Sequence, residues 1–247
     1  MTGVGAGGDA AGGCLPPVPA AAGTPPEDIS SRMNAAGAGL SRPVIAFDSA
    51  AAHCAAALLA PDGTVLAARF EAMARGQAEA LVPLLEAVLA EAGIGWRDIG
   101  GIAVGTGPGN FTGIRIAVAT ARGLALALGV PAVGVTAFEV MRDAALAGPG
   151  AAEGDGVVCL QAPRGMVLAQ AFRGGVPEGA PFVLDPDAPG IAAPVLAGVS
   201  GADVAERIGR IGLARLQCGA PAARPAPCYV RPPDAAPAPA SAPRLLA

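Results

Sequence analysis

The chain has 247 residues, of which 53% are hydrophobic and 15% charged, a composition that excludes an intrinsically disordered protein and supports a sizeable core. Its formal net charge is −4 and all 16 basic residues are arginines without a visible basic stripe. This balance excludes direct electrostatic capture of nucleic acid by this chain alone.

The first half of the chain carries the clearest periodic patterns. Residues 1–42 are rich in Gly, Ala and Pro and predict a disordered tail, and we expect Met33 to be the start of translation. The elements expected next are strands over 43–49, 53–59 and 65–70, a helix over 77–91, a strand over 99–104 and a helix that begins near residue 111.

The second half is richer in Gly and Pro and its patterns are shorter. The elements expected there are strands over 133–135, 157–161, 166–172 and 194–198 and helices over 138–147 and 202–211, with 214–217 ambiguous. This order suggests two related halves. We therefore divide the chain into a tail over 1–42, a first subdomain over 43–140, a second and smaller subdomain over 141–235, and a disordered tail over 236–247.

A glycine-rich turn follows the strand at 99–104 and opens directly onto a long helix. Such a turn presents backbone N–H groups to an anion. The strand at 43–49 ends in a carboxylate and a hydroxyl at the same expected edge of the sheet. The candidate nucleotide-type site therefore comprises Asp48, Ser49, Gly105, Gly107, Gly109, Asn110 and Thr112, with Thr112 expected to cap the helix. The alternatives are a vestigial site and a tight structural turn.

The helix after the turn has small residues at two sets of positions spaced by four, at 113, 117 and 121 and at 119, 123 and 127. The helix at 77–91 is also apolar on more than one face. Two neighbouring helices with spare apolar surface predict a helix-on-helix interface with a partner. The residues expected to form it are Leu81, Leu84, Leu85, Val88, Gly113, Ala117, Ala121 and Leu124.

Catalytic and metal-binding patterns are missing from the sequence. The single histidine, His53, lies on a predicted strand with no nucleophile placed beside it, and no HxxxH motif is possible. The five cysteines are scattered without CxxC spacing, so we expect free thiols in a reducing cytoplasm. The longest apolar stretch, 114–130, contains two arginines, so we expect no membrane span.

Four segments together resemble the TsaB family: VIAFDS at 44–49, RGQAEALVPLL at 75–85, GTGPGNFTGIRIAVATARGLALALGVPAVGVTAFE at 105–139 and CYVRPPD at 228–234. The resemblance implies an α/β fold of the actin-like (ASKHA) type, with two RNase H-like halves whose mixed sheets are flanked by helices. It also implies a non-catalytic scaffold for threonylcarbamoyladenosine modification of tRNA next to the anticodon.

The resemblance further implies partners. TsaD would carry the transferase site and TsaE the ATPase, and the first two helices would bind TsaD, or a second copy of the chain when TsaD is absent. The chain would reach tRNA only through the complex and have no cofactor of its own, with ATP or ADP at the partner interface left open. The sequence departs from the family at Gln77, where histidine is common, and in the loop 161–166, which matches only at Arg164.

Two other functions stay open from sequence. The first is a self-sufficient ATPase or kinase of the actin-like superfamily that would use Asp48 and the glycine turn. The second, a peptidase, is disfavoured by the single histidine and the missing nucleophile motif.

Overall fold

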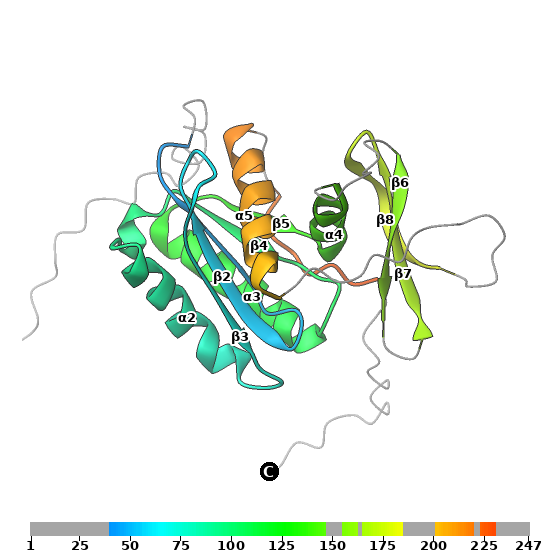
Figure 1. The fold of residues 1–247 in the computed structure, drawn as a ribbon, viewed down its shortest axis with the longest axis horizontal. Helices are drawn as coiled ribbons and strands as arrows, with labels where there is room; N and C mark the ends of the chain where they lie inside the picture. Colours follow the sequence, from blue (N-terminus) through cyan, green and yellow to red (C-terminus); the bar gives the residue numbers. More distant parts are fainter. Residues whose placement is uncertain (1–39, 147–154, 163–164, 185–200, 220–222, 231–247) are drawn as a thin grey trace, which may run out of the picture.

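The computed structural model describes residues 40–146, 155–162, 165–184, 201–219 and 223–230. They form a five-stranded sheet covered by helices and a separate three-stranded sheet, which lie on either side of helix α4 (Figure 1). Residues 1–39 and 236–247 of the predicted tails, the loop residue Arg164 and the strand expected at 194–198 lie outside the described residues. Residues 40–42, assigned to the first tail, are described, and Arg42 donates a hydrogen bond to the Asp98 carbonyl oxygen.

The first sheet has the strand order β3-β2-β1-β4-β5. Its strands are β1 (Val44–Asp48), β2 (His53–Leu59), β3 (Val65–Ala72), β4 (Gly101–Gly105) and β5 (Ala132–Val135). The pairs β1–β2 and β2–β3 are antiparallel, whereas β1–β4 and β4–β5 are parallel. The predicted meander and the strands after it are confirmed, with bounds that differ by up to two residues.

Three helices cover the two faces of this sheet. α2 (Gln77–Glu91) and α3 (Phe111–Leu128) lie on one face, and α5 (Gly201–Gln217) lies on the other (Figure 1). Alternation along β1 explains the two layers, because Ile45 and Phe47 enter the core under α2 and α3 while Val44 and Ala46 enter the core under α5. A short 3-10 helix, η1 (Trp96–Asp98), precedes β4.

The second half contains α4 (Ala137–Leu146) and the antiparallel strands β6 (Gly156–Gln161), β7 (Val167–Arg173) and β8 (Val176–Leu184). The sequence did not predict β8. α4 joins the halves, because Phe138 and Met141 pack with Val158 and Phe172 while Val140 packs under α5.

α5 differs from the sequence prediction in length and in place. It is one continuous helix that includes residues 214–217, and its glycines let it lie close to the sheet. A Cβ atom at Gly209 would collide with Leu59, and one at Gly212 with Ala103. Although α5 falls in the range assigned to the second subdomain, it packs on the first sheet. The subdomain bounds therefore stay a prediction.

α3 is long and apolar enough to cross a membrane by length and composition alone. In the structure its buried residues pack against β1, β4 and β5. The helix is therefore explained as a layer of the α/β fold.

Candidate functional site

The candidate site lies where β1 and β4 end. These strands are parallel neighbours, so the turns after them meet at one edge of the sheet. The meeting is so close that a Cβ atom on Gly105 would collide with Oδ1 of Asp48, and one on Gly109 would collide with the carbonyl oxygen of Ala50. These glycines are therefore required by the approach of the chain's own β1–β2 turn.

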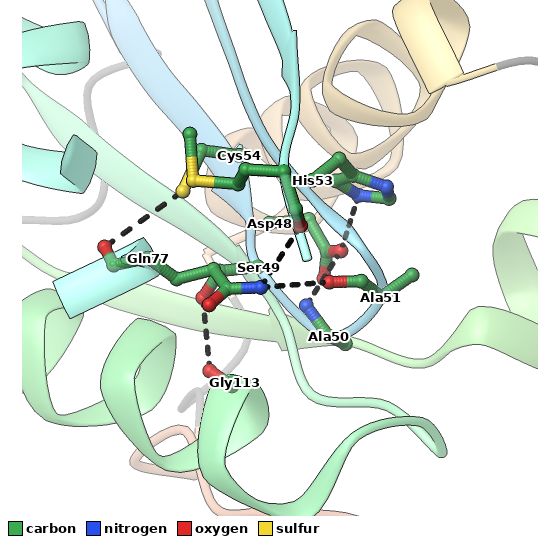
Figure 2. Close-up of polar contacts among 9 residues, drawn as sticks. Asp48, Ser49, Ala50, Ala51, His53, Cys54, Gln77 and Gly113 are labelled. Atoms are coloured by element: carbon green, nitrogen blue, oxygen red, sulfur yellow. Dashed lines mark hydrogen bonds and ion pairs between the residues drawn. The ribbon is translucent and has the colours of Figure 1, made fainter. Parts of the chain in front are cut away.

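Asp48 is held by its neighbours in the same turn (Figure 2). It is 5% exposed, and its Oδ2 accepts hydrogen bonds from the backbone N–H of Ala50 at 2.9 Å and, in the corresponding tautomer, from Nε2 of His53 at 2.9 Å. The His53 ring also packs on Phe70, with ring centroids 5.3 Å apart. The single histidine is thus a partner of Asp48 and part of the sheet's packing.

Ser49 ties the same turn to the start of α3. Its Oγ donates a hydrogen bond to the carbonyl oxygen of Gly113 at 2.9 Å (Figure 2), and a Cβ atom on Gly113 would collide with the carbonyl oxygen of Ser49. The backbone N–H of Asn110 donates to the carbonyl oxygen of Ala50 at 2.6 Å. The predicted site residues do come together, and the hydrogen bonds of Asp48, Ser49 and Asn110 go to neighbouring residues of the two turns and of α3.

The prediction that Thr112 caps α3 is wrong. Asn110 is the N-cap, and its Oδ1 accepts hydrogen bonds from the N–H groups of Thr112 at 2.9 Å and Gly113 at 3.2 Å. Thr112 itself is exposed in the first turn. An Asn side chain reaches the free N–H groups of a helix from the N-cap position, which is where the glycine turn places Asn110.

Gln77, at the start of α2, reaches the same turn from the other side (Figure 2). Its Nε2 donates to the carbonyl oxygen of Ala51 at 3.5 Å and to that of Met73 at 3.3 Å. The Cys54 thiol donates a hydrogen bond to the Gln77 carbonyl oxygen at 3.8 Å. Burial raises the pKa of this thiol to about 11, and the negative charges of Glu71 and Asp48 add to the shift. The β1–β2 turn is therefore tied to both α2 and α3.

A cleft of about 1120 Å³ lies between this edge of the first sheet and the second half. Its described lining is mostly Ala, Gly, Ile, Val, Leu and Met, includes Asp48 and His53, and contains no arginine. Two N–H groups of the first turn of α3, those of Thr112 and Gly113, already donate to Asn110. The described lining therefore offers the phosphates of a nucleotide no cationic side chain. Among the described residues, no group of His, Cys, Asp or Glu could hold a metal ion.

The predicted interface residues lie mostly in the chain's own core, so the faces assigned to the partner need correction. Six of them belong to the core cluster under α2 and α3: Leu81, Leu84, Leu85, Val88, Ala117 and Ala121. Gly113 is buried against Ser49, and Leu124 is partly buried. Side chains three and four apart share one helix face, and here that face is the one that meets the sheet.

The opposite face of the two helices is exposed. On α2, Val82 is 39% exposed beside Pro83, and on α3, Leu126 is 72% exposed. The second small-residue row of α3, at Ala119, Gly123 and Ala127, is exposed as well. We call Val82, Pro83, Ala119, Gly123, Leu126 and Ala127 the outer face.

A cluster that the sequence did not reveal lies at the N-terminal end of α3. The guanidinium carbon of Arg115 lies 3.8 Å from the centroid of the Phe111 ring, and Arg115 Nε donates to the Tyr229 hydroxyl at 2.9 Å. Phe111 and Tyr229 stack with centroids 5.0 Å apart. The spacing of four between Phe111 and Arg115 was a usable signal. Tyr229 belongs to the CYVRPPD segment, but it is 114 residues from Arg115, so the sequence could not place the two side by side.

Solved structures with the same fold come from Pseudomonas aeruginosa. One, an uncharacterized protein with similarity to peptidase YeaZ, matches with a TM-score of 0.61 and 24% identity over 77% of this chain and 100% of that chain. Another, YeaZ, is 31% identical over 63% of this chain and 72% of that chain, with a TM-score of 0.51. The chain belongs to the TsaB (YeaZ) family. The predicted α/β fold class is confirmed by these structures, and its actin-like type is what the TsaB resemblance implies.

Two sequence matches agree with this TsaB assignment. Residues 70–173 match the family model TsaD, described as tRNA N6-adenosine threonylcarbamoyltransferase. The tRNA threonylcarbamoyladenosine biosynthesis protein TsaB of Escherichia coli is 38% identical over 102 residues. That alignment spans 41% of this chain and 43% of the E. coli protein.

Both departures from the TsaB pattern are local in the structure. At the position where histidine is common in the family, Gln77 makes the hydrogen bond to the β1–β2 turn given above. The described ends of the loop 161–166 close a tight connection between β6 and β7, where the Ala162 N–H donates to the Met166 carbonyl oxygen at 2.8 Å.

Proposed function

We propose that this chain is a non-catalytic scaffold subunit that binds a TsaD-type transferase for threonylcarbamoyladenosine modification of tRNA next to the anticodon. The E. coli relative is named for biosynthesis of that nucleoside, and the matching family model is named for the transferase. In this proposal the chain works in the cytoplasm with TsaD and TsaE, and it reaches tRNA only through the complex.

The observation that carries the proposal is the outer face of α2 and α3. A row of small residues allows another helix to approach closely, and exposed Val82 and Leu126 supply apolar surface that gains from being covered. The face covers one turn of α2 and the second half of α3, which suits a helix-on-helix contact with a protein partner.

Charges around the outer face favour a partner of matching pattern. The exposed charges on this part of α2 are Glu79 and Glu86, whereas those on α3 are Arg115 and Arg122. An acidic helix beside a basic helix is complementary to a second pair arranged in the opposite sense. A second copy of the chain could therefore replace the transferase when the transferase is absent.

The glycine turn supports a role without nucleotide turnover. The β1–β2 turn fills the space beside its glycines. Asn110 accepts from the Thr112 N–H at the start of the helix, and Asp48 is hydrogen-bonded to Ala50 and His53. An actin-like ATPase needs this edge open for phosphates. We therefore favour a vestigial site over ATP or ADP binding in this chain.

Size-exclusion chromatography with light scattering tests the proposal, using the full chain alone and mixed with the TsaD paralogue of the same genome. We expect a one-to-one complex that replaces a self-dimer. Gly123→Arg should abolish both species without unfolding the chain, because a Cβ atom at that position would meet no described atom within 4 Å beyond its own turn of helix. Val176→Arg is the control, because Val176 is exposed on β8, away from α2 and α3.

The alternative function is a self-sufficient ATPase, and the cleft with Asp48 in its lining is the observation that favours it. ATP hydrolysis by the isolated chain that disappears in Asp48→Ala would replace the scaffold proposal. Peptide cleavage lost in His53→Ala would instead support the peptidase reading.

A further inference from the structure

The cluster of Phe111, Arg115 and Tyr229 places one guanidinium in a fixed position at the surface. The Phe111 ring lies under its plane, and the Tyr229 hydroxyl accepts from Nε. Arg115 is exposed, and its two terminal amino groups have no hydrogen-bond partner among the residues that the structure describes. An arginine held in this way has already lost much of the side-chain entropy that binding would otherwise cost.

The C-terminal segment 223–230 keeps Tyr229 in place. The Cys228 N–H donates to the carbonyl oxygen of Thr106 in the glycine turn at 2.8 Å, and Val230 packs against the core of the second half. Tyr229, 40% exposed, therefore sits between two anchored neighbours. This segment crosses from the first half to the second, so the orientation of Arg115 depends on the far end of the chain.

Arg115 stands on the same side of α3 as the outer face. Ala119, Arg122, Gly123 and Leu126 follow it at spacings of four, seven, eight and eleven, which bring all of them to one side of a helix. The cluster is therefore continuous with the proposed docking surface. Arginine and tyrosine at the end of an apolar patch are typical of residues that contribute strongly to protein–protein binding.

We propose that Arg115 is the main polar anchor of this docking surface, that it binds an Asp or Glu carboxylate of the transferase paralogue, and that Phe111 and Tyr229 position it. The inference rests on the proposed function. The terminal amino groups, which have no partner within the described part of the chain, suit a carboxylate in a bidentate contact. A protein carboxylate is favoured over an RNA phosphate because the surface between the two arginines is apolar and the chain's net charge is −4.

Isothermal titration of the full chain with the transferase paralogue of the same genome tests the inference. Arg115→Ala should weaken binding by about tenfold or more, and Arg115→Lys should not restore it, because lysine lacks the planar fork. The control is Arg173→Ala, an exposed arginine of β7 that lies outside the docking surface, with an expected change below about threefold. Tyr229→Phe keeps the ring stack, removes the hydroxyl and should weaken binding to an intermediate extent.

Two further readouts separate anchoring from a structural role. The melting temperature of Arg115→Ala should stay within about 2 °C of the wild type, because its side chain is exposed. The wild-type affinity should fall more than that of Arg115→Ala between about 50 mM and about 300 mM salt. A large drop in melting temperature, or equal salt dependence, would show that the cluster only holds the chain end.

The outcomes also distinguish this inference from the function beneath it. If Gly123→Arg abolishes the complex and Arg115→Ala leaves its affinity unchanged, the docking surface stands and the anchor is wrong. If Gly123→Arg binds normally, the proposed docking surface itself is wrong. If Arg115→Ala binds the paralogue normally but the assembled complex no longer retains tRNA, the contact is to RNA and the inference is overturned.

Discussion

The two small-residue rows of α3 have the same spacing and opposite environments. Gly113, Ala117 and Ala121 are buried against the sheet, whereas the row that begins at Ala119 faces outward. In the first row the packing requires a small residue: at Gly113, for example, a Cβ atom would collide with the carbonyl oxygen of Ser49. In the second row nothing in the described chain requires it. A small residue without an internal reason is therefore the better indicator of a partner.

The largest effect expected from this comparison is at Ala121. Ala121→Arg places an unpaired charge in the core under α2 and α3 and should lower the free energy of unfolding by about 3–5 kcal/mol, measured by urea denaturation. Ala119→Arg, two residues earlier on the exposed row, should change it by no more than about 0.5 kcal/mol. Equal stability of both variants would show that the faces are assigned the wrong way round.

A matched pair of glycines gives the next effect. Gly113→Ala should destabilise the chain by about 1–3 kcal/mol, because its Cβ atom would press on the Ser49 backbone. Gly123→Ala should stabilise the free chain by up to about 1 kcal/mol, because alanine has the higher helix propensity and the space is open. Thermal unfolding of both variants measures the contrast, and a change of the same sign in both would contradict it.

Capping of α3 has a smaller expected effect. Asn110→Ala removes the acceptor for two N–H groups of the first turn and should cost about 1 kcal/mol of unfolding free energy. Thr112→Ala serves as the control and should leave stability nearly unchanged, since Thr112 contributes only its backbone to the cap. A larger loss in the Thr112 variant would restore the sequence-based cap.

The smallest expected effect is a pH dependence of stability that comes from Cys54 in the core under α2 and α3. The pKa of Cys54 is raised in the folded chain from 9.0 to about 11, first by burial and then by Glu71 and Asp48. The neutral thiol is therefore favoured by folding, so its contribution to stability is fully present below pH 9 and is lost as pH rises through about 11. The stability difference between wild type and Cys54→Ala should shrink over that range. A constant difference would contradict the burial of the thiol.

Much of the first half could be predicted from sequence, because its patterns are local. The leucines of 77–91 repeat at helical spacing, and the predicted bounds of α2 match the structure. β8 could not be found in the same way, because Pro177, Gly179 and Pro181 interrupt its run and its strand geometry comes from pairing with β7. The helix predicted at 202–211 includes Gly209 but stops before Gly212, and the role of both glycines becomes visible only when the sheet lies beneath them.

The candidate site shows the same limit. Sequence placed Asp48 and the glycine turn at one edge, because the ends of parallel strands meet there. It could not show that the β1–β2 turn fills the space next to the glycines, since this depends on contacts between residues more than fifty positions apart. It likewise assigned Leu81 and Ala121 to a partner, because an apolar helix face does not indicate which of two surfaces covers it.

The position of α5 determines when the first half of the molecule can be complete. One face of its sheet, with Ala46, Leu59 and Val133, is covered by a helix that begins at residue 201. During synthesis this apolar face stays bare until the second half has been made, and a nascent chain with bare apolar surface is prone to aggregate. The second half is thus inserted within the folding unit of the first, and a fragment that stops before residue 201 leaves that unit open.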